Sequence, residues 1–136
     1  MDDRPLLVSL PVADRPRAHV FYREALGLEA VGEPADDGVP EPLTFVLNAG
    51  TRLMLVPTGG LGRVIGDRTV APAGVSECVL GIGAGSDAEV DEIVDRARRA
   101  GATVAIEPGR QPWGYAASFA DPDGHMWTVT SSPLPA

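Results

Sequence analysis

Alternating apolar and polar residues open the chain. Along Leu6–Val12 every second residue is a large aliphatic one, which predicts a strand. The apolar positions then recur every three or four residues, which predicts a helix between an N-cap at Asp14 and a stop at Gly27. Three further strands are predicted at Leu28–Val31, Leu43–Asn48 and Arg52–Pro57. The first half of the chain therefore has the order β-α-β-β-β.

The second half repeats this order. A strand is predicted over Glu77–Ile82, followed by a helix with a capping box at Ser86–Glu89 and a stop at Gly101. Strands follow at Thr103–Ile106, Tyr115–Ala120 and His125–Thr130, the last two joined by the tight turn Asp121–Gly124. Because each half leaves one sheet face uncovered, the duplication predicts a single domain over residues 1–136. Its modules span about 5–57 and about 75–132.

The segments between these elements are predicted to be loops. Residues 32–42 hold three prolines and four acidic residues, which is typical of a mobile loop. Residues 58–74 hold five glycines without clear periodicity and are predicted to be a long connection, or a flap over a site. A third loop is predicted at Pro108–Gly114.

Composition narrows the range of partners. The net charge is −8, and all 11 basic residues are arginine, so an acidic surface would repel a phosphate backbone and we expect no nucleic-acid partner. No apolar run approaches the roughly 20 residues that a membrane helix needs. The single cysteine, Cys78, excludes an internal disulfide and, with the acidic start of the chain, favours the cytoplasm.

Two stretches carry a family resemblance. They are LPVADRPRAHVFYREALGLE (Leu10–Glu29) and FADPDGHMWTV (Phe119–Val129). Together with the paired module order they resemble the vicinal oxygen chelate superfamily, the glyoxalase/bleomycin-resistance/dioxygenase group, over nearly the whole chain. The resemblance implies an α+β fold of two βαβββ modules. These would form a U-shaped, partly open, eight-stranded mixed barrel with its helices outside. It also implies a ligand inside the U, and a homodimer.

Strand parity divides the side chains into two sets, and the resemblance indicates which set faces the ligand. The helix-facing set is Leu6, Val8, Leu10, Val12, Cys78, Leu80 and Ile82. The ligand-facing set is Leu7, Ser9, Glu77, Val79, Ser118, Met126 and Thr128.

The metal site of the family is predicted to be missing. The resemblance puts the ligand positions at Leu7, within Leu53–Leu55, at Glu77 and at Thr128. Only Glu77 among them offers a good donor to a divalent ion. The two histidines, His19 and His125, fit a helix surface and a turn better than a metal site. We therefore expect no metal and no cofactor, and neither glyoxalase I nor extradiol dioxygenase activity.

Two other features are candidates for chemistry. Glu77 would act as a general base or meet a cationic ligand; alternatively it lies at the rim in water or pairs with Arg52 or Arg110. Trp113 and Tyr115, on a Pro/Gly loop, offer flat faces for stacking a planar ligand. Trp113 has two alternatives, plugging the barrel or joining a dimer contact.

The sequence thus favours a metal-free protein that binds a small molecule, cationic or aromatic. Such a protein would sequester a drug in the manner of bleomycin-resistance proteins. Two enzymatic alternatives stay open: a glyoxalase-like metal-dependent lyase, isomerase or dioxygenase, and a metal-free enzyme with Glu77 as its base. The predicted ligand-binding residues are Ser9, Glu77, Val79, Trp113, Tyr115, Ser118, Met126 and Thr128.

Overall fold

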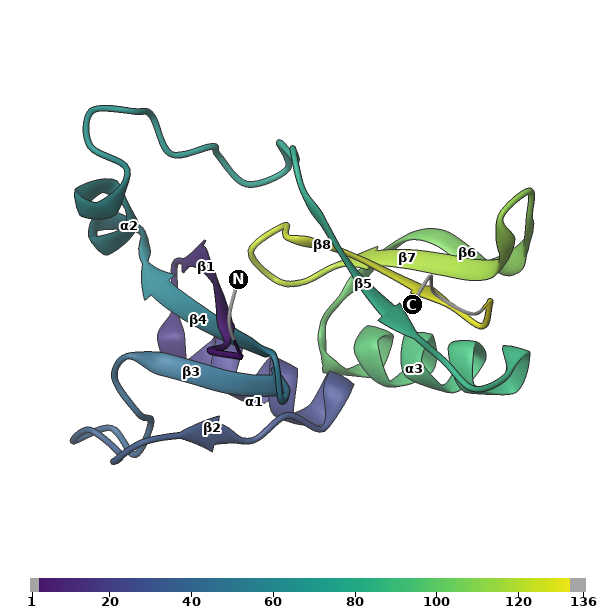
Figure 1. The fold of residues 1–136 in the computed structure, drawn as a ribbon, viewed down its shortest axis with the longest axis horizontal. Helices are drawn as coiled ribbons and strands as arrows, with labels where there is room; N and C mark the ends of the chain where they lie inside the picture. Colours follow the sequence, from purple (N-terminus) through teal and green to yellow (C-terminus); the bar gives the residue numbers. More distant parts are fainter. Residues whose placement is uncertain (1–2, 133–136) are drawn as a thin grey trace. The chain divides into compact units, whose positions relative to one another are not determined.

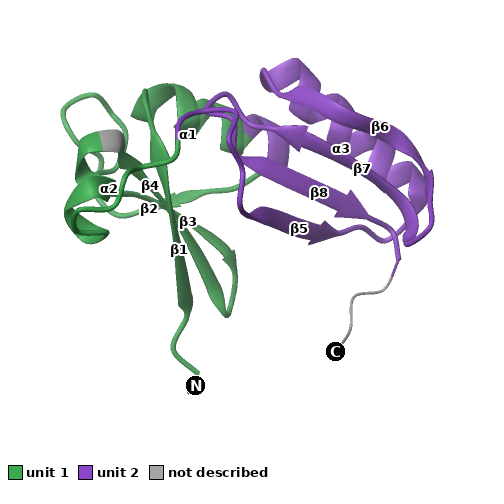
Figure 2. Cartoon of the chain, turned by 90° about the horizontal axis from the view of Figure 1, so that it is seen from above, with its two compact units in different colours: residues 1–23, 27–71 green, residues 24–26, 72–136 purple. Residues whose placement is uncertain are grey.

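The structure is a computed structural model that describes residues 3–132. It contains two four-stranded mixed sheets, each accompanied by helices (Figure 1). The described residues fall into two compact units, one of residues 3–23 and 27–71 and one of residues 24–26 and 72–132 (Figure 2). The predicted α+β class is confirmed.

The first unit has the predicted β-α-β-β-β order. Its elements are β1 (Leu6–Val12), α1 (Arg15–Leu26), β2 (Ala30–Val31), β3 (Leu43–Asn48) and β4 (Thr51–Pro57). The strands lie in the order β1-β4-β3-β2, and β1 runs parallel to β4 while the other pairs are antiparallel. The second strand is shorter than predicted, with two residues in the ladder.

One face of this first sheet packs on α1. Phe45, Leu53 and Leu55 point to that face and are fully buried. The ring of Tyr22 on α1 lies 5.7 Å from the ring of Phe45, and both side chains are fully buried. The centre of the first core is therefore aromatic, as the apolar stripe of the helix predicts.

The second unit repeats the arrangement. Its elements are β5 (Val79–Gly83), α3 (Asp87–Ala100), β6 (Thr103–Gln111), β7 (Gly114–Ala120) and β8 (Met126–Thr130). The strand order β5-β8-β7-β6 matches that of the first sheet, and β5 again runs parallel to β8. Val90 and Val94 of α3 are fully buried, as are Phe119 and Val129 of the sheet. The predicted duplication is confirmed.

Both long helices begin and end as the sequence predicts. The side chains of Asp14 and Ser86 each accept a hydrogen bond, 3.1 Å long, from the backbone N–H three residues further on. Gly27 and Gly101 stop the helices with φ of 66° and 115°, in the left-handed region that glycine adopts without a steric cost. The two modules thus share their helix signals as well as their strand order.

The predicted loop over Pro108–Gly114 is wrong. Strand β6 continues through Pro108 to Gln111, and only two residues separate it from β7. Two register shifts interrupt its pairing with β7, between Val104 and Ile106 and between Ile106 and Gly109. Because β6 is an edge strand with bulges, a proline that lacks an N–H is tolerated there.

The connection after β4 also departs from the prediction, because it begins with the helix α2 (Thr58–Val64). Glycine is unfavourable within a helix, so TGGLGRV carries no helical signal. A Cβ atom at Gly60 would lie 2.8 Å from Cγ1 of Val56, so the absence of a side chain lets the first turn approach β4. No helix in residues 3–132 is long and apolar enough to span a bilayer.

Candidate functional site

The second sheet has one face packed on α3 and one face open. Val79 of β5 pairs with Met126 of β8, and Thr128 of β8 pairs with Ser118 of β7. Because these strands are neighbours, the four side chains form one continuous patch, which we call the open-face patch. Strand alternation puts them opposite the face that carries the buried Trp127. The structure therefore brings together four of the eight residues predicted from the sequence.

Small residues surround this patch. Gly81 lies on the open face of β5 and pairs with Thr128, and Ala116 occupies the open face of β7. A Cβ atom at Gly81 would lie 3.6 Å from Cγ2 of Thr128, an ordinary contact distance. Because glycine has no side chain, the backbone of β5 is exposed at this position. Strand parity alone indicates both small residues, although neither is among the eight predicted residues.

Two hydroxyl groups make the patch partly polar. Thr128 Oγ1 donates a hydrogen bond to the carbonyl oxygen of Ala117, 3.1 Å away. The hydroxyl of Ser118 makes no hydrogen bond to any residue in the range 3–132. Beside them, the Val79 side chain is 55% exposed. Ser118 itself is buried, with 9% of its surface exposed. The patch thus offers an apolar surface beside one buried hydroxyl that has no hydrogen bond within this range.

Ser9 belongs to the other unit, on the open face of the first sheet. It pairs with Met54 of β4, while Leu7 pairs with Arg52. Ser9 is exposed, and Leu7 is 49% exposed. This face resembles the open-face patch in its mixture of aliphatic, thioether and hydroxyl side chains.

Tyr115 lies on the opposite face of the second sheet from the patch. Its hydroxyl donates a hydrogen bond to Oδ1 of Asp91 on α3, 2.7 Å away. This hydrogen bond raises the pKa of Tyr115, and burial and the charges of Asp91 and Asp87 add to the shift. The guanidinium of Arg110 lies 5.6 Å from the centre of the ring. Tyr115 therefore takes part in a polar network with α3.

Trp113 lies in the two-residue turn between β6 and β7. Its side chain is 61% exposed, the most exposed aromatic side chain in the described part of the chain. This exposed side chain is available for stacking on a ligand or for a contact with a second copy.

Glu77 precedes the second sheet. It is exposed, two residues before β5 begins, so the predicted strand started two residues too early. Its carboxylate forms no hydrogen bond or ion pair with the residues that the structure describes. Arg110 pairs instead with Asp87 at 3.2 Å, and Arg52 donates to the carbonyl oxygen of Asn48 at 2.7 Å.

Apart from Glu77, the positions that the resemblance assigns to metal ligands hold poor donors. Leu53 and Leu55 are fully buried on the helix side, so Met54 is the residue of that segment on the open face. A thioether does not suit a hard divalent cation. Among residues 3–132 no three histidine, cysteine, aspartate or glutamate side chains are grouped so that they could hold a metal ion.

Both histidines lie where the sequence analysis put them. His19 is on α1, where its ring stacks at 6.2 Å on the ring of Phe45. His125 follows the tight turn, in which the carboxylate of Asp121 accepts hydrogen bonds from the backbone N–H groups of Asp123 and His125. Backbone geometry therefore explains the buried Asp121 without catalysis.

Solved structures with a similar fold have several kinds of function. A glyoxalase-related enzyme from Fulvimarina pelagi is 24% identical with a TM-score of 0.80, covering 96% of this chain and 91% of that chain. TnmS3, an antibiotic-binding protein from Streptomyces sp. CB03234, is 27% identical with a TM-score of 0.60, covering 93% of each chain. A lactoylglutathione lyase from Agrobacterium tumefaciens is 25% identical with a TM-score of 0.66, covering 94% of this chain and 92% of that chain.

No curated protein is significantly similar to the chain. The family model that describes the Glyoxalase/Bleomycin resistance protein/Dioxygenase superfamily matches residues 4–129. This match covers both modules and includes both stretches that carry the resemblance. The chain therefore belongs to the glyoxalase/bleomycin resistance protein/dioxygenase superfamily.

Proposed function

We propose that this protein binds a small amphipathic molecule, cationic or aromatic, on the open-face patch without a metal ion, and so sequesters a compound such as an antibiotic. The observation that carries the proposal is the composition of the patch. Val79 and Met126 supply apolar surface, Ser118 supplies a buried hydroxyl that has no hydrogen bond among the described residues, and no imidazole or carboxylate lies in the paired positions. Such a surface suits an apolar body with one polar group.

Charge and likeness support the same proposal. A net charge of −8 raises the local concentration of a cation and lowers that of an anion. TnmS3, which is similar over 93% of this chain, is described as an antibiotic-binding protein. Ser9 and the exposed Trp113 are proposed as further ligand contacts, because each offers an unburied side chain of the right chemistry.

Isothermal titration against a panel of amphipathic compounds, cationic, neutral and anionic, tests the proposal. The decisive variant is Gly81→Val, because its side chain would contact Thr128 on the open face and cover the exposed backbone of β5. A strand accepts a β-branched residue readily. We expect Gly81→Val to weaken binding at least tenfold. The control Tyr115→Phe changes the opposite face and should bind as the wild type does. Equal binding by Gly81→Val and wild type would refute the site.

An enzymatic alternative is favoured by the likeness to the lactoylglutathione lyase. It requires a bound metal. Elemental analysis after incubation with Ni, Zn, Fe, Mn and Co and desalting distinguishes the two: about one metal per chain would favour the lyase, isomerase or dioxygenase class. A metal-free enzyme with Glu77 as its base would instead lose turnover in Glu77→Gln while keeping its binding.

We also propose a homodimer acting in the cytoplasm. Large apolar side chains outside the open-face patch are exposed on both sheets, including Leu6, Val31 and Ile106, and a second copy would cover such surface. Sedimentation velocity measures the oligomeric state. Trp113→Ala separates the two roles proposed for that residue: loss of the dimer indicates an interface, whereas loss of ligand affinity with an intact dimer indicates stacking.

A further inference from the structure

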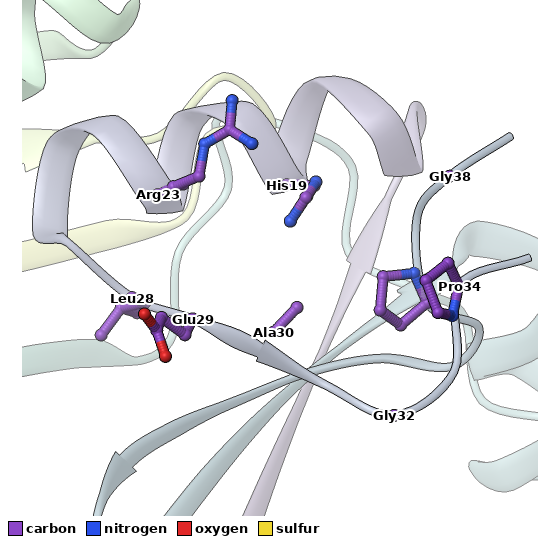
Figure 3. Close-up of a pocket in the computed structure, with 9 residues that line it drawn as sticks. His19, Arg23, Leu28, Glu29, Ala30, Gly32, Pro34 and Gly38 are labelled. Carbon is purple, nitrogen blue, oxygen red and sulfur yellow. The ribbon is translucent and has the colours of Figure 1, made fainter.

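A pocket lies within the first unit, between α1 and β2. It has a volume of about 340 Å³ and is bounded by α1, by β2 and by the segment that follows β2. Its lining residues are His19, Arg23, Leu28, Glu29, Ala30, Gly32, Pro34, Gly38 and Pro40. Figure 3 shows the ring of His19 between α1 and Ala30 of β2, with Pro34 and Gly38 beside it. The volume is within the usual range for small-molecule sites.

The outer wall of this pocket is held in place. Arg15 of α1 donates hydrogen bonds of 2.9 Å to the carbonyl oxygens of Val39 and Pro40, and pairs with Asp37 at 2.5 Å. Pro34 and Pro40 form a β-bridge across the base of the segment. The segment predicted to be a mobile loop is therefore tied to α1, and the pocket is formed before a ligand arrives.

Its charge is positive on the side of the helix. Arg15, His19 and Arg23 follow one another at four-residue spacing, so they lie along one face of α1. Asp37 neutralises Arg15, but the side chain of Arg23 has no hydrogen bond or ion pair within the described residues. Burial, and then the charges of Arg23 and Arg15, lower the pKa of His19. On the helix side of the pocket, Arg23 is therefore an exposed cation without a counter-ion among the described residues.

Its remaining lining is mostly apolar. Leu28, Ala30, Pro34 and Pro40 offer aliphatic surface. One acidic side chain, Glu29, also lines the pocket and is exposed. An anion without an apolar body would leave most of this surface unused.

We propose that this pocket is a second binding site that takes a small organic carboxylate with an apolar body. The carboxylate would bind Arg23, whose planar guanidinium suits bidentate pairing, and an N–H of His19. The body would lie against Pro34 and Pro40. The negative charge of Glu29 opposes the ligand and limits its affinity.

Benzoate is a suitable probe, and the histidine ring signals in an NMR titration are a direct readout. The chain has two histidines, so His125 serves as an internal reference for His19. We expect benzoate to shift the His19 signals with saturation and to leave those of His125 in place. Benzylamine, with a similar body and the opposite charge, should leave both unchanged.

Three variants test the assignment. Arg23→Gln should weaken benzoate binding about tenfold, since a charge-assisted contact is lost. Glu29→Gln should strengthen it, because a repulsive charge is removed. Arg17→Gln, on the same helix but outside the pocket lining, should bind as the wild type does. An unmoved His19 signal, an equal response to benzylamine, or weaker binding by Glu29→Gln would overturn the proposal.

Discussion

The hydroxyl of Tyr115 donates a hydrogen bond of 2.7 Å to Oδ1 of Asp91 on α3. This contact fixes the side of the sheet to which the tyrosine belongs. Ser118, three residues later on β7, faces the other side. One strand therefore serves two surfaces, a polar network beneath α3 and the open-face patch.

Ultraviolet titration of tyrosinate will show Tyr115 ionising above its ordinary pKa of 10.0, chiefly because Asp91 accepts its proton in a hydrogen bond. The raised pKa means that this stabilisation is fully present below pH 10.0 and is lost as the pH rises through the folded-state value. Asp91→Ala removes both the acceptor and the charge and should bring the pKa back toward 10.0. The variant Tyr115→Phe identifies which titration belongs to Tyr22.

His19 should titrate below its ordinary pKa of 6.5. Burial is the main cause, followed by Arg23 and Arg15, and Arg23→Gln should therefore move the pKa upward. As the pH falls, His19 binds a proton at a higher pH in the unfolded chain than in the folded protein. The free energy of unfolding therefore falls as the pH drops below 6.5 and levels off below the folded-state pKa. NMR titration of the ring protons measures the pKa of His19 in the wild type and in Arg23→Gln, and urea denaturation at several pH values measures the free energy of unfolding. A His19 pKa that does not respond to Arg23→Gln would contradict this electrostatic account.

Replacement of Phe45 by alanine should lower the free energy of unfolding by about 3–5 kcal/mol, the usual cost of removing a buried aromatic side chain. Phe45 is fully buried, and its ring lies 5.7 Å from that of Tyr22. The matched control is Val46→Ala, one residue later and exposed, for which about 0.5 kcal/mol or less is expected. Urea denaturation of both variants makes the comparison, and equal losses would show that α1 does not cover this sheet.

Gly124→Ala should destabilise the protein more than Gly27→Ala does. Both glycines have a positive φ, 89° and 66°, which costs a residue with a Cβ atom about 1–2 kcal/mol. A Cβ atom at Gly124 would also lie 2.9 Å from the backbone nitrogen of Gly74, whereas nothing lies within 4 Å of one at Gly27. Thermal denaturation ranks the two variants. Equal losses would mean that the backbone at Gly74 does not contact the Asp121–Gly124 turn closely enough to exclude a side chain.

The sequence predicted the parts of the fold that local chemistry decides. Asp14 and Ser86 cap their helices, and Gly27 and Gly101 end them, because caps and left-handed stops depend on the residue itself. It did not predict α2, because its glycines oppose a helix and its packing against β1 is tertiary. Nor did it predict the strand through Pro108, because its tolerance there depends on an edge position.

The site was predicted in part for the same reason. Parity placed Val79, Ser118, Met126 and Thr128 on one face, and the pairings join them. Tyr115 has the same parity as Phe119 on β7, which puts both on the face of the sheet that α3 covers. The sequence instead predicted that Tyr115 lies on a ligand-binding loop. The hydrogen bond to Asp91 depends on where α3 packs, which the sequence does not show. The pocket at His19 was not predicted from the sequence, because its wall depends on hydrogen bonds from Arg15 to residues more than 20 positions away.

The missing side chain at Gly81 has an evolutionary consequence. The space above β5 exists because residue 81 has no Cβ atom. A Cβ atom would fit there in ordinary contact with Thr128. A single-nucleotide change in a glycine codon yields alanine or valine, so one mutational step can fill the space above β5. The buried face of the same strand would not change. The shape of the open face can therefore change in one step while the core beneath it is kept.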